Sequence, residues 1–247
     1  MTELLWGKEP ARTRGPKPAI TLTAIAEVAI AIADAEGHDA VSMQRVAGEL
    51  PVTKMALYRH VPGKAELVAV MSDLAMGSPP DRPDLPPEIS WREALRTWAI
   101  DLYDGFTRHP WLLQSTIGRR LLGPNELAWM ERGVAALSGT GLSGGEQFDS
   151  ILVITSHVRN IAQQSTTFPG HTTGLTEEDM QQSFAEILST EADRFPHLTA
   201  AMRTSAGSEN QGLEFGLQRI LDGLDLLVRG RIAVPDRIET LPIERRG

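Results

Sequence analysis

A run of side chains between residues 53 and 64 could bind a nucleic acid. It contains a hydroxyl, a cation, an apolar group, a phenol and a second cation, which belong in this order to Thr53, Lys54, Met55, Tyr58 and Arg59. Hydrogen-bonding groups mixed with apolar ones suit the base edges and phosphates of a major groove. Lys64 adds an ammonium group at the start of the next expected helix, whose free backbone N–H groups also attract phosphate.

Two short helices are expected to position these groups. Ser42 can cap the first, whose apolar residues fall at helical spacing: Met43, Val46, Ala47 and Leu50. Pro51 ends that helix, because proline lacks a backbone N–H and disfavours helical geometry in the residue before it. Thr53 can cap a second helix that runs to His60. The spacing fits a DNA-reading helix-turn-helix and fits equally a packing unit with a solvated polar face.

The stretch resembles the N-terminal DNA-binding domain of the tetracycline-repressor (TetR) family over residues 18 to 76. The residues that follow the family pattern are Gly37, Leu57, Tyr58, His60, Val61, Gly63, Lys64 and Leu67. This resemblance implies phosphate contacts from Tyr58 and Lys64. It implies base reading by Gln44, Thr53, Lys54, Met55 and Arg59, and Arg45 is expected at the DNA with them. Pro51 departs from the family, which has glycine at this turn.

The net charge of −8 is unevenly distributed along the chain. Residues 1 to 77 contain eight Lys or Arg and nine Asp or Glu, which leaves −1 there and −7 in the remainder. Residues 42 to 64 alone carry +3, from four basic residues against Glu49. An acidic protein can therefore present a local basic face to DNA. The basic segment before residue 18 fits a minor-groove arm and a solubilising tail equally well.

Composition narrows the class of protein. The chain has 247 residues, 41% of them hydrophobic, which is enough for a real core. It has no cysteine, so disulfides and thiolate metal sites are excluded. No secretory leader or membrane span is recognisable, and we expect a cytoplasmic protein that joins the nucleoid when bound to DNA. We expect no cofactor and no bound metal.

Helical periodicity predicts an all-α fold in two domains. The expected parts are a flexible basic arm over 1–17, the DNA-binding domain over 18–77, a proline-rich linker over 78–90, a regulatory and dimerisation domain over 91–232, and a tail over 233–247. Beyond a first helix over 21–36, the helices expected after the linker are 91–108, 110–122, 125–138, 143–166, 176–190, 195–202 and 209–230. The last domain also resembles the C-terminal domain of the tetracycline repressor.

One motif offers an enzymatic alternative. Residues 141–145 match G-x-S-x-G, which in α/β-hydrolases presents a nucleophilic serine between a strand and a helix. No strand is expected here, and Ser143 with Glu146 forms the S-x-x-E pattern of a helix cap. The histidines are scattered, with none near a nucleophile. We therefore expect no catalytic residue and no enzyme.

The last predicted helix carries an apolar stripe that points to a subunit interface. Its residues alternate at three- and four-residue steps: Leu213, Leu217, Ile220, Leu224 and Leu227. Phe215, Leu221 and Leu226 add apolar surface outside the stripe, so the helix has more than one face to cover. A helix buried centrally in its own domain would show the same pattern. The family resemblance implies a four-helix dimer interface shared with the helix over 143–166.

Aromatic and amide side chains of the central helices suggest a site for a small organic effector. The candidate residues are Trp98, Phe106, Gln114, Trp129, His157, Asn160 and Gln164. Mostly apolar walls with a few polar groups are typical of such sites, although an ordinary aromatic core would use the same residues. The sequence thus predicts a ligand-responsive regulator, a homodimeric repressor of a palindromic operator. The alternative is a small-molecule-binding or hydrolytic helical protein whose helix-turn-helix only packs.

Overall fold

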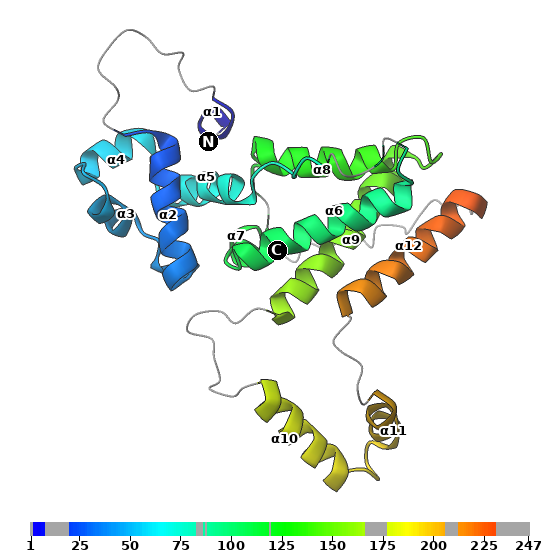
Figure 1. Ribbon diagram of the computed structural model, residues 1–247. Helices are drawn as coiled ribbons and strands as arrows, with labels where there is room; N and C mark the ends of the chain where they lie inside the picture. Colours follow the sequence, from blue (N-terminus) through cyan, green and yellow to red (C-terminus); the bar gives the residue numbers. More distant parts are fainter. Residues whose placement is uncertain are drawn as a thin grey trace, which may run out of the picture.

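The computed structural model describes residues 2–7, 20–82, 86, 88–118, 120–165, 177–205 and 212–230. All regular secondary structure in this part of the chain is helical, which confirms the predicted all-α fold. Figure 1 shows one group of helices around α2 to α4 and a second around α6, α8, α9 and α12, with α5 reaching between them. Across the described residues, no helix combines the length and apolar character needed to cross a bilayer.

The first group is built from helices with side-chain caps. It comprises α2 (Leu22–Glu36), the short 3-10 turn His38–Ala40, α3 (Met43–Glu49), α4 (Lys54–His60) and α5 (Lys64–Met76). The hydroxyls of Thr21, Ser42 and Thr53 accept backbone N–H groups at the starts of α2, α3 and α4, at 3.1, 3.1 and 3.3 Å. These three caps satisfy donors that a helix start leaves unpaired, as the sequence predicted for Ser42 and Thr53.

The turn between α3 and α4 accommodates Pro51. Helix α3 ends at Glu49, and Leu50 adopts extended backbone angles, φ −108° and ψ 146°. The N–H of Val52 then donates to the carbonyl of Leu50 at 2.8 Å. Leu50 is extended and the ring of Pro51 fixes a negative φ, so neither position needs a glycine. Behind the turn, Val46 and Leu57 are fully buried, and α3 packs against both α2 and α4.

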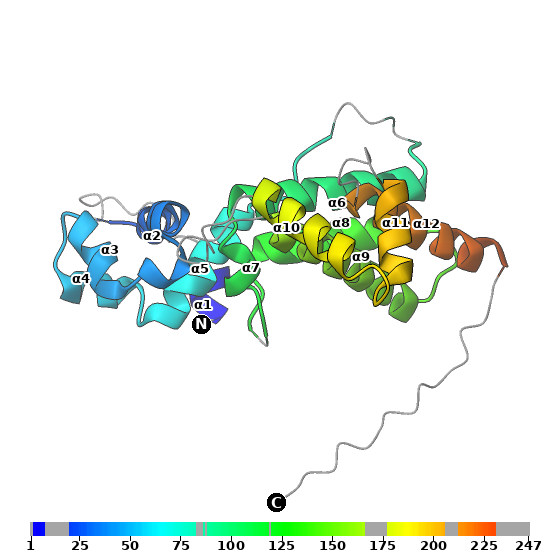
Figure 2. The same cartoon turned by 90° about the horizontal axis from the view of Figure 1, so that it is seen from below.

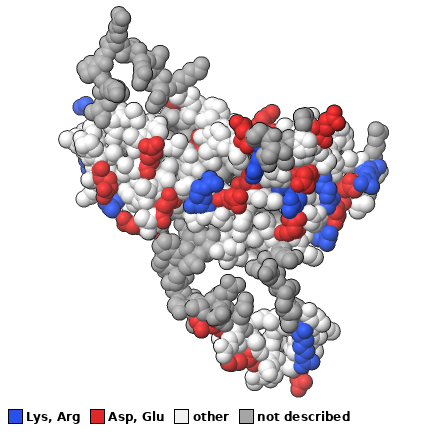
Figure 3. Space-filling model, viewed as in Figure 1, with Lys and Arg blue, Asp and Glu red and all other residues white. Residues whose placement is uncertain are grey.

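The second group forms the larger core. Helix α6 (Trp91–Arg108) packs against α8 (Pro124–Ala136), α9 (Gly144–Ser165) and α12 (Gly212–Gly230), and the short α7 (Leu112–Ser115) contacts α5. Viewed from below, the two groups still lie at opposite ends, with α5 and α7 between them (Figure 2). On the outer face, Arg92 and Arg96 of α6 pair with carboxylates of α12. Blue and red groups therefore alternate there in Figure 3.

Helices α10 (Glu177–Thr190) and α11 (Pro196–Ser205) pair with each other and lie apart from the core in Figure 1. Leu188 and Thr199 are buried between them. The hydroxyl of Thr199 also lies 3.5 Å from the carbonyl oxygen of Leu188, so the pair has a small interior of its own.

Two parts of the chain differ from the prediction. Residues 2 to 6, expected in a flexible arm, form the short helix α1 (Thr2–Trp6), which packs on α5. The indole of Trp6 donates to the carbonyl of Leu122 at 3.0 Å. The helix expected over 110–122 is only α7, and a loop replaces the rest. The remainder of the expected arm, residues 8–17, and the tail over 233–247 lie outside the described residues.

Candidate functional site

The predicted DNA-reading side chains form an exposed surface on α3, α4 and the start of α5. All eight are exposed: Gln44, Arg45, Thr53, Lys54, Met55, Tyr58, Arg59 and Lys64. Met55 is the most prominent apolar group, with 70% of its surface accessible. Helix α4 is anchored from below by the buried Leu57, which leaves its opposite face open. The surface could enter a groove without local unfolding.

The basic groups of this surface are not equivalent. Arg45 bonds with Glu36, at 2.9 Å, and with Glu49, and these two hydrogen bonds raise the pKa of its guanidinium. Its charge is already balanced, so a phosphate would compete with two carboxylates. By contrast, no ion pair within the described ranges involves Lys54, Arg59 or Lys64. These three cations are the ones available to phosphate.

A cavity of about 500 Å³ lies within the second helical group. Its apolar walls come from α6, α8 and α9, chiefly Trp98, Leu102, Phe106, Trp129, Met130 and Ile151. Its polar side comes from the loop after α7 and from one face of α9: Thr116, Arg120, Thr155, Ser156 and Arg159, with Glu126 of α8. Apolar walls with a few converging polar groups are what small organic ligands require.

The structure brings only part of the predicted effector site together. Trp98, Phe106 and Trp129 line the cavity, as their aromatic character suggested. The predicted polar members do not line it. Gln114 is exposed, as are Asn160 and Gln164, which bond to each other at 2.7 Å. The Nε2 of His157 lies 3.0 Å from the Leu213 carbonyl oxygen. The imidazole ring also fills the space where a side chain at Gly216 would lie. This histidine therefore packs α9 onto α12.

The polar groups that do line the cavity were missed from the sequence. Arg159 is the most informative of them. It follows Ile151 and Thr155 at successive four-residue steps, so all three share one face of α9, and all three line the cavity. This spacing was a usable signal, because an arginine on a largely apolar helix face needs a specific partner. Arg120 and Thr116 had no such signal, since they lie in a loop that was expected to be helical.

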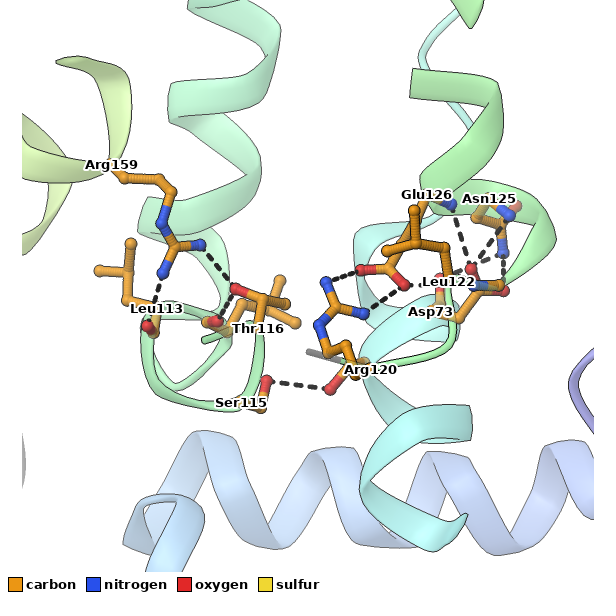
Figure 4. A network of polar contacts seen from close by, with 12 residues as sticks. Asp73, Leu113, Ser115, Thr116, Arg120, Leu122, Asn125, Glu126 and Arg159 are labelled. Carbon is orange, nitrogen blue, oxygen red and sulfur yellow. Dashed lines mark hydrogen bonds and ion pairs between the residues drawn. The ribbon is translucent and has the colours of Figure 1, made fainter. Parts of the chain in front are cut away.

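Arg159 is held in place by neutral acceptors (Figure 4). One terminal nitrogen donates to Thr116 Oγ1 at 2.6 Å and the other to the carbonyl of Leu113 at 2.7 Å. The guanidinium carbon lies 5.0 Å from the centre of the Phe106 ring. Burial, and secondly the positive charge of Arg120, lower the pKa of Arg159. Arg120 itself is neutralised by Glu126 through both terminal nitrogens.

Asp73 of α5 connects the first helical group to the wall of the cavity. Its Oδ1 accepts the backbone N–H groups of Asn125 and Glu126, at 3.0 and 3.1 Å, and so caps the start of α8. The side-chain amide of Asn125 also donates a hydrogen bond of 3.1 Å to Oδ2 of Asp73 (Figure 4). Since Glu126 also holds Arg120, a continuous polar network runs from α5 to the cavity.

Four further polar contacts join the two groups. Ser72 of α5 bonds to Ser115 of α7 at 2.9 Å between the hydroxyl oxygens. The cavity residue Trp129 donates to the carbonyl of Gly77, just after α5, at 2.9 Å. Asp34 of α2 accepts from the indole of Trp111 at 2.7 Å and lies 2.8 Å from His109 Nδ1. A displacement of the cavity wall would therefore be passed to α2 and α5.

Asp73 should make stability depend on pH in an unusual direction. Burial raises its pKa above the ordinary value of 3.8, and the nearby charge of Glu126 raises it further. The folded state then binds the proton more tightly than the unfolded chain. Its stabilising contribution is complete below that ordinary value and is lost as pH rises through the folded pKa. We expect the free energy of unfolding of the parent, relative to Asp73→Asn, to fall as the pH rises from that ordinary value of 3.8 towards neutrality.

Urea unfolding of both proteins across this range measures the difference. The amide introduced by Asp73→Asn retains an oxygen acceptor for the cap but does not titrate, which makes this variant the matched control. A difference that stays constant, or that grows with pH, would contradict the assignment.

The serine motif is a helix cap, as its spacing predicted. The hydroxyl of Ser143 lies 2.9 Å from the carboxylate of Glu146, and the backbone N–H of Glu146 points back to that hydroxyl at 3.3 Å. The N–H of Ser143 also donates to Glu146, at 2.7 Å. These hydrogen bonds lower the pKa of Glu146. The motif follows a helix and a turn, so the strand-to-helix geometry of a hydrolase nucleophile is missing at this position.

The apolar stripe predicted as a dimer interface lies largely inside the chain's own core. Leu217 is fully buried and Leu224 is nearly so. The other members are half-buried against that core: Leu213, Ile220 and Leu227. Helix α12 packs against α9 and α6, and these two helices cover the stripe. The apolar surface left for a partner is instead Phe215 and Leu226 on α12, with Phe148, Leu152 and Val153 on α9, all more than half exposed.

Comparison with known proteins adds a family context to this geometry. The family model "Bacterial regulatory proteins, tetR family" matches residues 25–71, and "Tetracyclin repressor-like, C-terminal domain" matches residues 82–228. The HTH-type transcriptional repressor DrrR1 of Streptomyces coeruleorubidus is 37% identical over 233 residues, which are 93% of this chain and 86% of that protein.

Solved structures show the same architecture. Apo ActR from Streptomyces coelicolor superposes with a TM-score of 0.71 at 27% identity, over 87% of this chain and 99% of ActR. ActR has also been solved in complex with actinorhodin. That structure matches with a TM-score of 0.67 at 28% identity, over 84% of this chain and 96% of ActR.

Proposed function

The chain belongs to the TetR family of bacterial regulatory proteins, and we propose that it is a homodimeric repressor of a palindromic operator. A small organic effector in the cavity would release it from the DNA, and it would act in the cytoplasm. The observation that carries this proposal is that α5 begins at an open basic reading surface and is joined by hydrogen bonds at its other end to the wall of a cavity.

The reading surface supports contact with a DNA duplex. Lys54 and Arg59 belong to α4, and Lys64 stands at the exposed start of α5. Tyr58, which the family resemblance assigns to a phosphate, lies between them on the same helix. A protein that reads DNA uses phosphate contacts to fix its position and other side chains to reach the base edges. Gln44, Thr53 and Met55 are exposed and could reach the base edges.

The effector would act through α5. This helix ends in the segment that bonds to α7 and α8 through Ser72, Asp73 and Gly77, and it begins beside the reading surface at Lys64. An effector that prefers one position of α8 and its preceding loop therefore favours one orientation of the reading head. Coupling of about 1 to 3 kcal/mol is typical between such sites and changes operator affinity by roughly 5- to 150-fold.

The relatives support a small organic effector. ActR, which shares the fold along most of both chains, has been crystallised with actinorhodin and with (S)-DNPA. A cavity of about 500 Å³ in this chain falls in the usual range for drug-sized ligands.

A second copy of the chain would meet the exposed apolar faces of α9 and α12. Two reading heads related by a two-fold axis match a palindrome, because its half-sites lie about 34 Å apart along the duplex. We assign the contact to Phe148, Leu152, Phe215 and Leu226 because the leucines of the original stripe are occupied inside the chain.

Removing phosphate contacts should weaken binding to every duplex alike. We expect Tyr58→Ala and Lys64→Ala each to lower affinity about tenfold on the palindrome selected by the parent protein from random duplexes. Because a homodimer carries two copies of Lys64, loss of this charge should also reduce the slope of log affinity against log salt by about two. Fluorescence anisotropy at several salt concentrations measures both quantities.

Arg203→Ala is the matched control, because it removes one exposed charge from α11, far from the reading surface in sequence. It should leave affinity and slope unchanged. If the parent protein selects no duplex from the random pool, the repressor proposal fails. If it does select one and neither variant weakens binding, the reading surface lies elsewhere.

A further inference from the structure

The positive and negative charges that line the cavity do not cancel. Among the described residues that line it, these groups are Arg120, Glu126 and Arg159. Arg120 and Glu126 neutralise each other through a bidentate pair. No carboxylate in the described part of the chain pairs with Arg159. The lining therefore carries one net positive charge, and it resides on Arg159.

This charge lies in surroundings that favour an anion. Arg159 is half-buried beside Phe106, and its hydrogen-bond acceptors, Thr116 and the Leu113 carbonyl, are both neutral. A partly desolvated cation is stabilised much more by an anion than by dipoles. The pKa of Arg159 is lowered by burial and by the positive charge of Arg120, because no nearby anion in the described ranges stabilises its charged form. Only part of its fork of N–H donors is used, so a carboxylate could still bind to it.

The aromatic walls of the cavity favour a flat ring system. Trp98, Phe106 and Trp129 contribute three aromatic side chains around one space, and Met130 and Ile151 close it. The indole N–H groups of the two tryptophans are already bonded, to the carbonyls of Trp129 and Gly77, at 2.9 Å each. These tryptophans are thus fixed by the protein and offer apolar ring surface to a ligand.

We propose that the effector is a planar polycyclic aromatic carboxylate, with its rings against Trp98, Phe106 and Trp129 and its carboxylate bound to Arg159. The inference rests on the proposed function in that it assigns the effector to this cavity. It goes further in naming the chemical class and the residue that selects it. Binding of the anion neutralises the net charge of the cavity and changes the hydrogen bonds of Arg159 with Thr116 and Leu113.

A pair of probes with the same rings and similar size, one anionic and one neutral, tests the proposal. Anthraquinone-2-carboxylate and the neutral anthraquinone-2-carboxamide are titrated into the full-length protein without DNA, and binding is followed by calorimetry and tryptophan fluorescence. We expect the acid to bind at least about tenfold more tightly than the amide, as for a hydrogen bond to a charged group. In Arg159→Gln the two compounds should bind with similar affinity.

The controls keep the outcome decisive. Arg203→Gln removes an exposed charge from α11 and should retain the parent's preference. Arg159→Lys keeps the charge without the planar fork and should retain part of it. Equal affinity of the parent for both probes, failure of the acid to bind, or an unchanged preference in Arg159→Gln would each overturn the proposal. Since no DNA is present, failure of operator release would refute the repressor proposal without affecting this one.

Discussion

A variant that combines Phe215→Glu and Leu226→Glu is expected to be monomeric at micromolar concentration and to bind the operator at least about a hundredfold more weakly. Both side chains are about two-thirds exposed on α12 and would be buried by a second copy of the chain. A two-fold contact would bury both new carboxylates from each subunit in one interface, so like charges would be buried together. A monomer has one reading head and loses the second half-site.

Light scattering coupled to size exclusion gives the mass, and anisotropy on the selected palindrome gives the affinity. Leu127→Glu is the matched control, since it places the same charge at an exposed leucine of α8, away from the α9 and α12 faces. It should remain dimeric and bind normally. A double variant that stays dimeric would refute the assignment of the contact to α12.

Gly123→Ala is expected to lower the free energy of unfolding by about 2 to 4 kcal/mol, the sum of overpacking and the loss of a helix cap. A methyl group at Gly123 would lie 2.1 Å from Cγ and Oδ1 of Asp73 and 2.7 Å from its Cβ. Asp73 would have to move away from the start of α8 and give up its bonds to Asn125 and Glu126. Effector response should weaken as well, because the same bonds join α5 to the cavity wall.

Chemical denaturation measures the loss, and Gly145→Ala is the control, because a methyl group there meets no atom within 4 Å. A double-mutant cycle identifies the cause. An Asp73→Ala background removes the contacts of 2.1 Å and the cap and leaves only the contact of 2.7 Å with Cβ, so Gly123→Ala should have a clearly smaller effect than in the parent. Equal effects in both backgrounds would show that the methyl group does not act through Asp73.

The reading head could be predicted because its signals are local. Ser42 and Thr53 are caps that act on the N–H groups of their own helices, and their neighbours follow helical spacing. The same holds for α6, which begins and ends at Trp91 and Arg108 as expected. Such contacts span a few residues, so a linear pattern contains them.

The segment over 110–122 shows where local patterns fail. Its apolar spacing favours a helix, but the chain leaves helical geometry after Ser115. Thr116 bonds to Arg159, which is 43 residues away, and Gly118 adopts a φ of 82°. These tertiary contacts and this left-handed residue outweigh a weak helical preference. Two polar residues of the cavity, Thr116 and Arg120, come from this loop, which is why these two were missed.

Periodicity identified an apolar face on α12 but not what covers it. The stripe through Leu217 and Leu224 was rightly recognised as apolar, and an intrachain neighbour covers it where a second subunit was expected. On α9, the choice between Arg159 and Asn160 as the cavity residue depends on how the helix is rotated against α6 and α12. That rotation is set by packing across the whole domain.

The loop between α7 and α8 allows ligand recognition and DNA recognition to evolve separately, because their residues lie in different segments of the chain. Thr116 and Arg120 line the cavity, and Gly123 and Leu122 support the polar network and α1, while the reading surface lies on α3, α4 and the start of α5. Changes at Thr116 or Arg120 can therefore alter which molecule is sensed and leave the operator sequence as it was. Relatives could diverge in their chemical signal while continuing to control the same genes.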